Sequence, residues 1–148
     1  MSPVRHFAAF ALAATAAIGL AQGNPVTGAH LPSQAAADVL RAAANADGAF
    51  LAAGLVKETY QKENLASLLQ YPSDAIVVVS LTGTQIRQAF ERSVSLFPQP
   101  NDSFLQVSGF EVTFSKAAAP EQRITSVLAG GLPLENSKTY QIAMPSSL

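Results

Sequence analysis

The sequence predicts a small single α+β domain with a mixed sheet and about three helices. Apolar residues recur at helical spacing over residues 35–43, 65–69 and 86–97. A run of β-branched residues fills positions 76–79, and apolar and polar residues alternate repeatedly after residue 104. Because helices interleave with strands early and strands dominate late, the pattern favours the α+β class.

The first residues of the chain predict export. A short polar stretch with Arg5 is followed by an uncharged apolar run at 7–20, which is shorter than the ~20 residues that a membrane helix needs. Small residues then offer cleavage after Ala21 or Gly23. We therefore interpret residues 1–23 as a signal peptide, the alternative being an uncleaved N-terminal anchor, and expect a secreted or periplasmic protein.

The composition of the 148-residue chain argues against several classes of partner. The sequence has no cysteine, so no disulfide framework forms and packing alone must stabilise an exported domain. The nine Lys and Arg residues never form a run and the formal net charge is -1, which argues against duplex nucleic acid as a partner. No second apolar run is long enough to cross a bilayer, so we expect no membrane contact after signal cleavage.

The first half of the chain is expected to alternate between helices and strands. Pro and Gly residues predict a flexible leader at 24–32, followed by the folded domain at 33–148. Ser33 is expected to cap a first helix that ends near residues 45–48. The elements expected next are a buried strand, a short second helix and a turn, at 49–53, 62–69 and 71–74.

The centre of the chain carries the clearest strand and helix signals. Residues 76–79 are apolar on both faces, so we expect a strand in the middle of its sheet. Thr82 and Gln85 have the spacing of a capping box that opens the third helix, and Pro98 ends it. The charged residues expected on the solvated side of this helix are Arg87, Glu91 and Arg92.

The last third of the chain is expected to consist of strands. Their positions are 104–107, 110–114, 123–128 and 140–144. Gly130 and Gly131 are expected to form a hairpin turn. Four aromatic residues near loops offer stacking faces, although packing is the commoner role for such rings: Tyr60, Tyr71, Phe97 and Phe104.

The chain lacks the side chains of a self-sufficient catalytic site. Its histidines are His6, which leaves with the signal peptide, and His30. One histidine and scattered carboxylates do not assemble a two-metal site, so we expect no catalytic residue, no metal and no cofactor. The sequence has neither a G-x-S-x-G nucleophile motif nor a phosphate-binding glycine loop, while a Ser–Lys pair stays open.

Four stretches of the sequence resemble the C-terminal domain of 5'-nucleotidases, exported enzymes that hydrolyse nucleotides. The stretches are DGAFLAAG at 47–54, IVVVSLTGTQIRQAFE at 76–91, FLQVSG at 104–109 and GLPLENSKTYQIAM at 131–144. In the complete enzymes a separate N-terminal metallophosphatase domain holds two metals and performs the chemistry. The resemblance therefore implies a substrate-recognition domain whose partner is a metallophosphatase domain on another polypeptide.

The resemblance also implies where a nucleotide would bind. The family stacks the base between two aromatic rings, and Tyr71 corresponds closely to the first ring, whereas the second falls near Ser147. The family phrase Asn-x-Gly-Gly-Ile-Arg corresponds to residues 52–57, where Lys57 keeps the charge of the arginine without its planar fork. The residues expected to contact a nucleoside or nucleotide ligand are Lys57, Tyr71 and Arg87.

The sequence leaves three functions open. The first is an exported nucleotide-binding or accessory module that is not catalytic alone. The second is one part of a nucleotide-hydrolysing phosphatase, completed by a separate domain or by a longer reading frame, because the family's glycine-rich phrase with its aspartate would follow residue 148. The third is a scaffold that has lost ligand binding.

Overall fold

The computed structural model describes residues 23–148 and confirms the α+β class with a mixed sheet. The signal-peptide prediction concerns residues outside this range, apart from Gly23. Within residues 23–148, two α-helices, α2 (Leu31–Ala44) and α3 (Gly83–Val94), accompany seven strands. Their bounds are β1 (Gly48–Ala52), β2 (Ile76–Thr82), β3 (Leu105–Ser108), β4 (Phe110–Phe114), β5 (Ile124–Ala129), β6 (Leu132–Pro133) and β7 (Thr139–Pro145).

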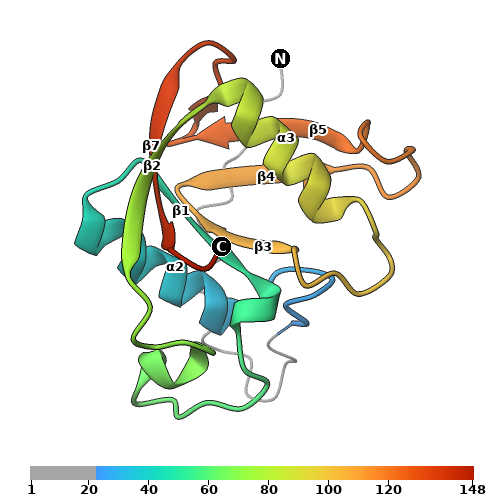
Figure 1. The fold of residues 1–148 in the computed structure, drawn as a ribbon. Coiled ribbons are helices and arrows are strands. Elements are labelled where there is room, and N and C mark those ends of the chain that lie inside the picture. The colour runs from blue at the N-terminus through green and yellow to red at the C-terminus, as the bar shows by residue number, and fades with distance from the viewer. Residues whose placement is uncertain (1–22) are drawn as a thin grey trace, which may run out of the picture.

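The strands form two sheets, which Figure 1 shows one above the other with the helices on their faces. The larger sheet has the order β2-β7-β1-β3, in which β1 and β7 are parallel and the other neighbours antiparallel. The smaller sheet, β4-β5-β6, is antiparallel. The main core fills the space between the two sheets and α3, where the rings of Phe50, Phe90 and Phe110 meet at centroid distances of 5.5 to 5.9 Å.

Gly109 lets the chain pass from one sheet to the other between β3 and β4. Its φ of +83° lies in the left-handed region, and a Cβ atom there would lie 2.3 Å from the carbonyl oxygen of Asp47. Only glycine fits this close approach. The hairpin turn expected at Gly130 and Gly131 is also present, between β5 and β6, with positive φ at both residues.

Helix α2 begins three residues earlier than predicted. The N-cap is His30 rather than Ser33, and Pro32 lies in the first turn, where its fixed φ favours a helix start. Ser33 is fully buried, and its hydroxyl lies 2.6 Å from Nδ1 of His30. Asn45 ends the helix in the left-handed conformation, inside the predicted boundary.

Residues 24–30, expected as a leader, lie against β3. The buried side chain of Gln106 donates to the carbonyl oxygens of Pro25 and Gly28, and accepts from the backbone N–H of His30 at 2.9 Å. The backbone N–H of Asn101 donates to Val26. These hydrogen bonds connect residues 24–30 to the domain. The fully buried side chain of Gln106 has backbone partners in this segment and so holds the segment in place.

The predicted second helix is reduced to the 3₁₀ turn η3 (Leu65–Leu68). Before it, Gln61 and Asn64 form a turn, and the hydroxyl of Ser67 donates to Asn64 and accepts from the N–H of Gln61. These local bonds compete with a regular helix, which is also costly to nucleate over so few residues. Leu68 is nevertheless fully buried, as its position in the predicted helix implied.

Two predictions about the β2–α3 unit have different outcomes. The capping box is confirmed, since the Thr82 side chain accepts from the Gln85 backbone and the Gln85 side chain accepts from Thr82. The central position of β2 is wrong, because β7 separates it from β1 and β2 forms an edge of the sheet. The β-branched residues of β2 indicate that both of its faces are apolar. They do not indicate how many strands pair with it.

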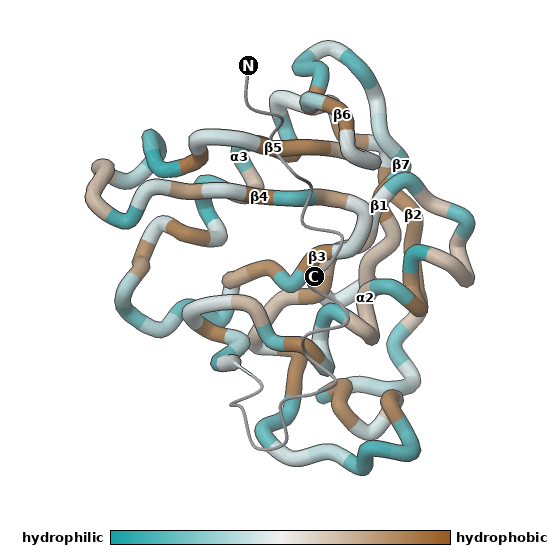
Figure 2. The backbone as a smooth tube through the Cα atoms, turned by 180° about the vertical axis from the view of Figure 1, so that it is seen from behind, coloured by the Kyte–Doolittle hydropathy of each residue, from teal (hydrophilic) through white to brown (hydrophobic). Residues whose placement is uncertain are grey.

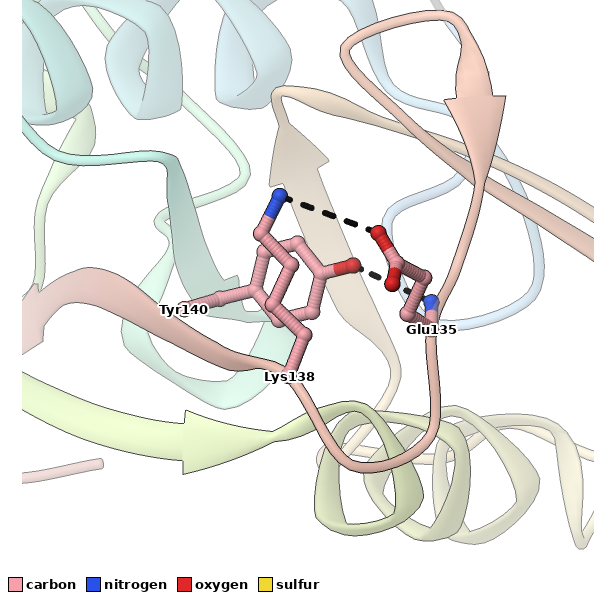
Figure 3. A network of polar contacts seen from close by, with 3 residues as sticks. All are labelled: Glu135, Lys138 and Tyr140. Carbon is pink, nitrogen blue, oxygen red and sulfur yellow. Dashed lines mark hydrogen bonds and ion pairs between the residues drawn. The ribbon is translucent and has the colours of Figure 1, made fainter.

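The turn before β7 is held by local contacts (Figure 3). The backbone N–H of Glu135 donates to the hydroxyl of Tyr140 at 3.1 Å, and the ammonium group of Lys138 lies 4.0 Å from the Glu135 carboxylate. The Tyr140 ring itself is buried in the core. Its hydroxyl thus anchors the 135–138 turn to the packed interior.

Candidate ligand-binding site

A small pocket opens where the paired ends of β2 and β7 meet the 71–74 turn. Its volume is about 160 Å³. Ile76 at the start of β2 pairs with Pro145 at the end of β7, and both residues line the pocket. Its remaining walls come from α2, from the segments on either side of η3 and from the residues after β7, through Leu40, Leu55, Leu69, Tyr71, Pro72, Asp74 and Ser147.

Tyr71 presents an exposed ring to this pocket. Its side chain is 57% exposed, and its carbonyl oxygen accepts from the backbone N–H of Asp74 at 3.0 Å, which closes the predicted turn. The preceding residue, Gln70, donates its N–H to Leu55 at 2.8 Å. The backbone beside the ring is therefore fixed, and an aromatic face on a fixed turn is suited to stacking.

Asp74 binds the C-terminal residues beside the same pocket through hydrogen bonds. Its carboxylate accepts from the hydroxyls of Ser146 and Ser147 at 2.5 Å each, and from the backbone N–H of Ser147 at 3.0 Å. The hydrogen bond from the Ser146 hydroxyl, with those from Ser147, lowers the pKa of Asp74 below its usual value. Asp74 is therefore ionised at neutral pH and places one negative charge in the pocket wall.

Sequence reasoning missed Asp74 as a site residue. It was assigned only to the turn, and its bond partners lie more than 70 positions away. A local pattern does not reveal such a contact. The available signal was the position of the aspartate directly after a Tyr-Pro turn and before a strand.

Lys57 has an exposed side chain and lies in a segment whose backbone bonds to residues 68–70, directly before Tyr71. Its backbone N–H donates to Leu68 at 2.8 Å, and the preceding residue, Val56, bridges to Leu69. Within residues 23–148 no carboxylate lies within ion-pair distance of its ammonium group. The charge of Lys57 is therefore available to an anionic ligand, although the residue does not line the pocket.

Arg87 lies in a different hollow, on the outer face of α3. That hollow is also lined by Glu91, Arg92 and Glu121. The structure therefore brings Tyr71 together with Ser147 and leaves Arg87 outside their pocket. The charges around Arg87 are mixed, so the hollow has no clear preference for an anion.

The described residues contain no grouping typical of metal catalysis. No three His, Cys, Asp or Glu side chains in residues 23–148 converge on a point that could hold an ion. The imidazole of His30 is buried at the start of α2, and burial lowers its pKa from the usual value. In the same part of the chain no helix is long and apolar enough to cross a membrane.

The fold is that of a small α+β domain with a pocket beside Tyr71. The family model of the 5'-nucleotidase C-terminal domain matches residues 12–148. The chain belongs to this family.

Curated relatives agree with this assignment over part of the chain. A snake venom 5'-nucleotidase from Naja atra is 32% identical over 94 residues, which are 58% of this chain and 18% of the relative. The 5'-nucleotidase of Rattus norvegicus is 34% identical over 94 residues, 58% of this chain and 16% of that protein. The chain thus spans less than one fifth of the length of these relatives.

Solved structures support the fold. A 5'-nucleotidase precursor from Thermus thermophilus superposes with a TM-score of 0.71 at 21% identity, over 84% of this chain and 26% of the other. A 5'-nucleotidase from Staphylococcus aureus, described as putative, gives a TM-score of 0.66 at 18% identity, over 82% and 28%. At these identities the likeness concerns the fold alone.

Proposed function

We propose that the chain is an exported nucleoside- or nucleotide-binding module of the 5'-nucleotidase C-terminal type that is not catalytic by itself. The observation that supports this proposal most is the meeting of Tyr71 and Ser147 in one pocket. Both positions were named from the sequence as those of the two base-stacking rings. In this chain one ring remains, and a serine stands opposite it.

The base of the ligand stacks on Tyr71, and the exposed ammonium group of Lys57 attracts a phosphate group that lies outside the pocket. The volume of about 160 Å³ is smaller than a typical ligand site, so the pocket seats a base while the sugar and phosphate lie outside. Asp74 repels a phosphate and accepts hydrogen bonds from base or ribose donors. The site therefore prefers a nucleoside to a highly charged nucleotide.

Hydrolysis requires a partner. The 94 matched residues are only 18% of the Naja atra protein, which makes that relative more than three times as long as this chain, and among residues 23–148 no group of side chains could hold a metal ion. A metallophosphatase domain on a second polypeptide would supply the two metals. The domain then recognises the substrate and presents it to that partner.

The alternative of a scaffold without ligand binding is favoured by three substitutions. Where the family phrase has Asn, Gly and Arg, this chain has Ala52, Leu55 and Lys57. Leu55 lines the pocket and narrows it. A direct binding experiment separates the two functions.

The test is an NMR titration of the purified protein with adenosine and adenosine monophosphate up to about 10 mM, which detects dissociation constants in the millimolar range. We expect shifts confined to the 55–57, 71–74 and 145–148 segments. Tyr71→Ala should weaken binding by roughly 5-fold or more, while Tyr71→Phe retains it, because only the aromatic face is needed. If no ligand shifts the NMR signals of Tyr71, the scaffold without ligand binding is the function that remains.

A phosphate-release assay tests the need for a partner. The protein alone, with manganese or zinc and adenosine monophosphate, is expected to release no phosphate. Turnover that depends on added metal would overturn the proposal, because the isolated chain would then be an enzyme.

A further inference from the structure

The pocket beside Tyr71 has a wall that is rich in hydrogen-bond acceptors and poor in donors. Three of its lining residues have polar side chains: Tyr71, Asp74 and Ser147. The described residues that line it include no Lys, Arg, His, Asn, Gln or Trp, the side chains that donate through nitrogen. The other lining side chains are hydrocarbon, among them Ile76 at the start of β2, a strand that Figure 2 shows as hydrophobic over most of its length.

The hydroxyl proton of Ser147 is not available to a ligand. An ionised carboxylate only accepts hydrogen bonds, so the 2.5 Å contact between the Ser147 hydroxyl and Oδ2 of Asp74 uses that proton. The Ser147 oxygen keeps lone pairs with which it can accept. Asp74 is itself ionised at neutral pH, because its pKa is lowered by the serine hydroxyls. Two neighbouring side chains of the wall therefore offer acceptors and no donor.

The backbone of the wall adds few donors. The N–H of Asp74 already donates to Tyr71, and the N–H of Ser147 donates to Asp74 at 3.0 Å. Pro72 and Pro145 have no backbone N–H. The edge of a ligand that enters here meets lone pairs, so an edge that carries hydrogen-bond donors is attracted and one that carries lone pairs is repelled.

We propose that this site selects bases with an exocyclic amino group, as in adenosine and cytidine, over bases with a carbonyl group in its place, as in inosine and uridine. The proposal rests on the proposed nucleoside-binding function and adds the class of base. An amino group presents two donors to Asp74 and Ser147, whereas a carbonyl oxygen presents lone pairs. The ring N–H of hypoxanthine or uracil is flanked by a carbonyl, which meets the same acceptors.

Two other donors can meet the wall without giving this selectivity. The Tyr71 hydroxyl both donates and accepts, so it favours neither class of base. The ribose hydroxyls are donors that all four nucleosides share. If the ribose contacts Asp74 in place of the base, the four nucleosides bind with equal affinity. A comparison of matched nucleosides therefore separates recognition of the base from recognition of the sugar.

The experiment is an NMR titration of the purified protein at neutral pH with two matched pairs, adenosine against inosine and cytidine against uridine. We expect the amino member of each pair to bind about 5-fold more tightly or better. Purine riboside has hydrogen in place of the amino group of adenosine. It loses the donor without gaining an acceptor, so its affinity should lie between those of adenosine and inosine.

Asp74→Asn tests the residue that determines the selectivity. The amide group of asparagine supplies a donor beside an acceptor, so the ratio of adenosine to inosine affinity should fall towards one. The matched control is Ser146→Ala, which removes another hydroxyl bond to Asp74 at a residue that does not line the pocket. This control should retain the selectivity. If Asp74→Asn does not fold, Ser147→Ala replaces it, because it removes the second acceptor of the wall and should also lower the ratio.

The outcomes distinguish this proposal from the function on which it rests. If no nucleoside shifts the signals of Tyr71, nucleoside binding and the selectivity both fail. If all four nucleosides bind with equal affinity, nucleoside binding holds and the selectivity alone is wrong. Tighter binding of inosine or uridine, or a preference for amino bases that Asp74→Asn and Ser147→Ala both leave unchanged, would also overturn the proposal.

Discussion

The side chains of Glu91 and Arg123 each form hydrogen bonds to backbone groups near the other residue. Their two charged groups do not pair with each other. The Glu91 carboxylate accepts from the backbone N–H groups of Arg123 and Ile124 at 3.0 and 2.7 Å. In return the buried guanidinium of Arg123 donates to three carbonyl oxygens at the end of α3, those of Val94, Ser95 and Phe97. The C-terminus of α3 is thereby fixed to the start of β5.

This reciprocal contact predicts a large effect of removing Arg123. Arg123→Ala leaves buried carbonyl oxygens at the helix end without donors, which should lower the free energy of unfolding by roughly 2–3 kcal/mol. The melting temperature should fall by roughly 5–10 °C. Glu91→Gln keeps one acceptor oxygen and should lower the free energy of unfolding by less than Arg123→Ala. Thermal unfolding followed by circular dichroism measures both variants.

The matched control is the exposed ion pair of Figure 3. Lys138 and Glu135 are 4.0 Å apart, with side chains 56% and 70% exposed. Glu135→Gln should change stability by less than about 0.5 kcal/mol, because water screens such a pair. If Arg123→Ala is no more harmful than this control, the helix-end contact has no stabilising role.

His30 predicts a dependence of stability on mild acid. Burial lowers its pKa in the folded protein below the usual 6.5 of the unfolded chain. The unfolded state therefore binds more protons in the interval between these two values, and stability rises with pH there. Stability is complete above about pH 6.5 and is lost progressively as pH falls towards the lowered folded value.

The measurement is urea unfolding at pH 7 and pH 5, compared with His30→Asn. Asparagine is a good helix N-cap but does not titrate in this range. The midpoint should fall on acidification in the wild type and change much less in the variant. Equal shifts in both proteins would assign the pH dependence to other groups.

The fold class follows from local patterns, whereas the neighbours of each strand do not. The capping box at Thr82 and Gln85 was predictable, because both partners lie within four residues of each other. The edge position of β2 was not, because the pairing of β2 with β7 joins residues more than 55 positions apart. The hydrogen bonds of the half-buried Glu91 were not predictable for the same reason, since its carboxylate accepts from the backbone of Arg123 and Ile124, more than 30 positions away.

Two members of the candidate pocket, Tyr71 and Ser147, were named from the sequence. Tyr71 was identifiable from a Tyr-Pro turn and a family resemblance, and Ser147 from its place in the same comparison. Asp74 and the wall residue Leu40 reach the pocket through tertiary contacts that carry no sequence signature. Arg87 was expected beside the ligand, but the helix directs it to another hollow.

Asp74 predicts release of the C-terminal residues in strong acid. Its pKa is lowered, so the contact with Ser146 and Ser147 is present above the ordinary value of about 3.9 and is lost as pH falls through the lowered one. Carboxyl NMR signals should give a midpoint for Asp74 below that of other aspartates. The amide of Ser147 should exchange faster below this midpoint, and in Asp74→Asn at every pH. A midpoint at the ordinary value would mean that the serine contacts do not form in solution.

The one-ring pocket predicts that affinity can be restored by a single substitution. Ser147 lines the pocket that Tyr71 enters, so Ser147→Phe places a second ring where a base can stack between two faces. A base–aromatic contact contributes roughly 1–3 kcal/mol, which corresponds to a gain of about 5- to 150-fold in nucleoside affinity.

Titration calorimetry with adenosine on the wild type, Ser147→Phe and Ser147→Ala measures this gain. Ser147→Ala removes the same hydroxyl bond to Asp74 without adding a ring, and it should not improve binding. A combined Tyr71→Ala/Ser147→Phe variant should lose most of the gain, because one ring then remains. Improvement that persists without Tyr71 would mean that the base binds elsewhere, and no improvement in Ser147→Phe would show that the two positions do not enclose a base.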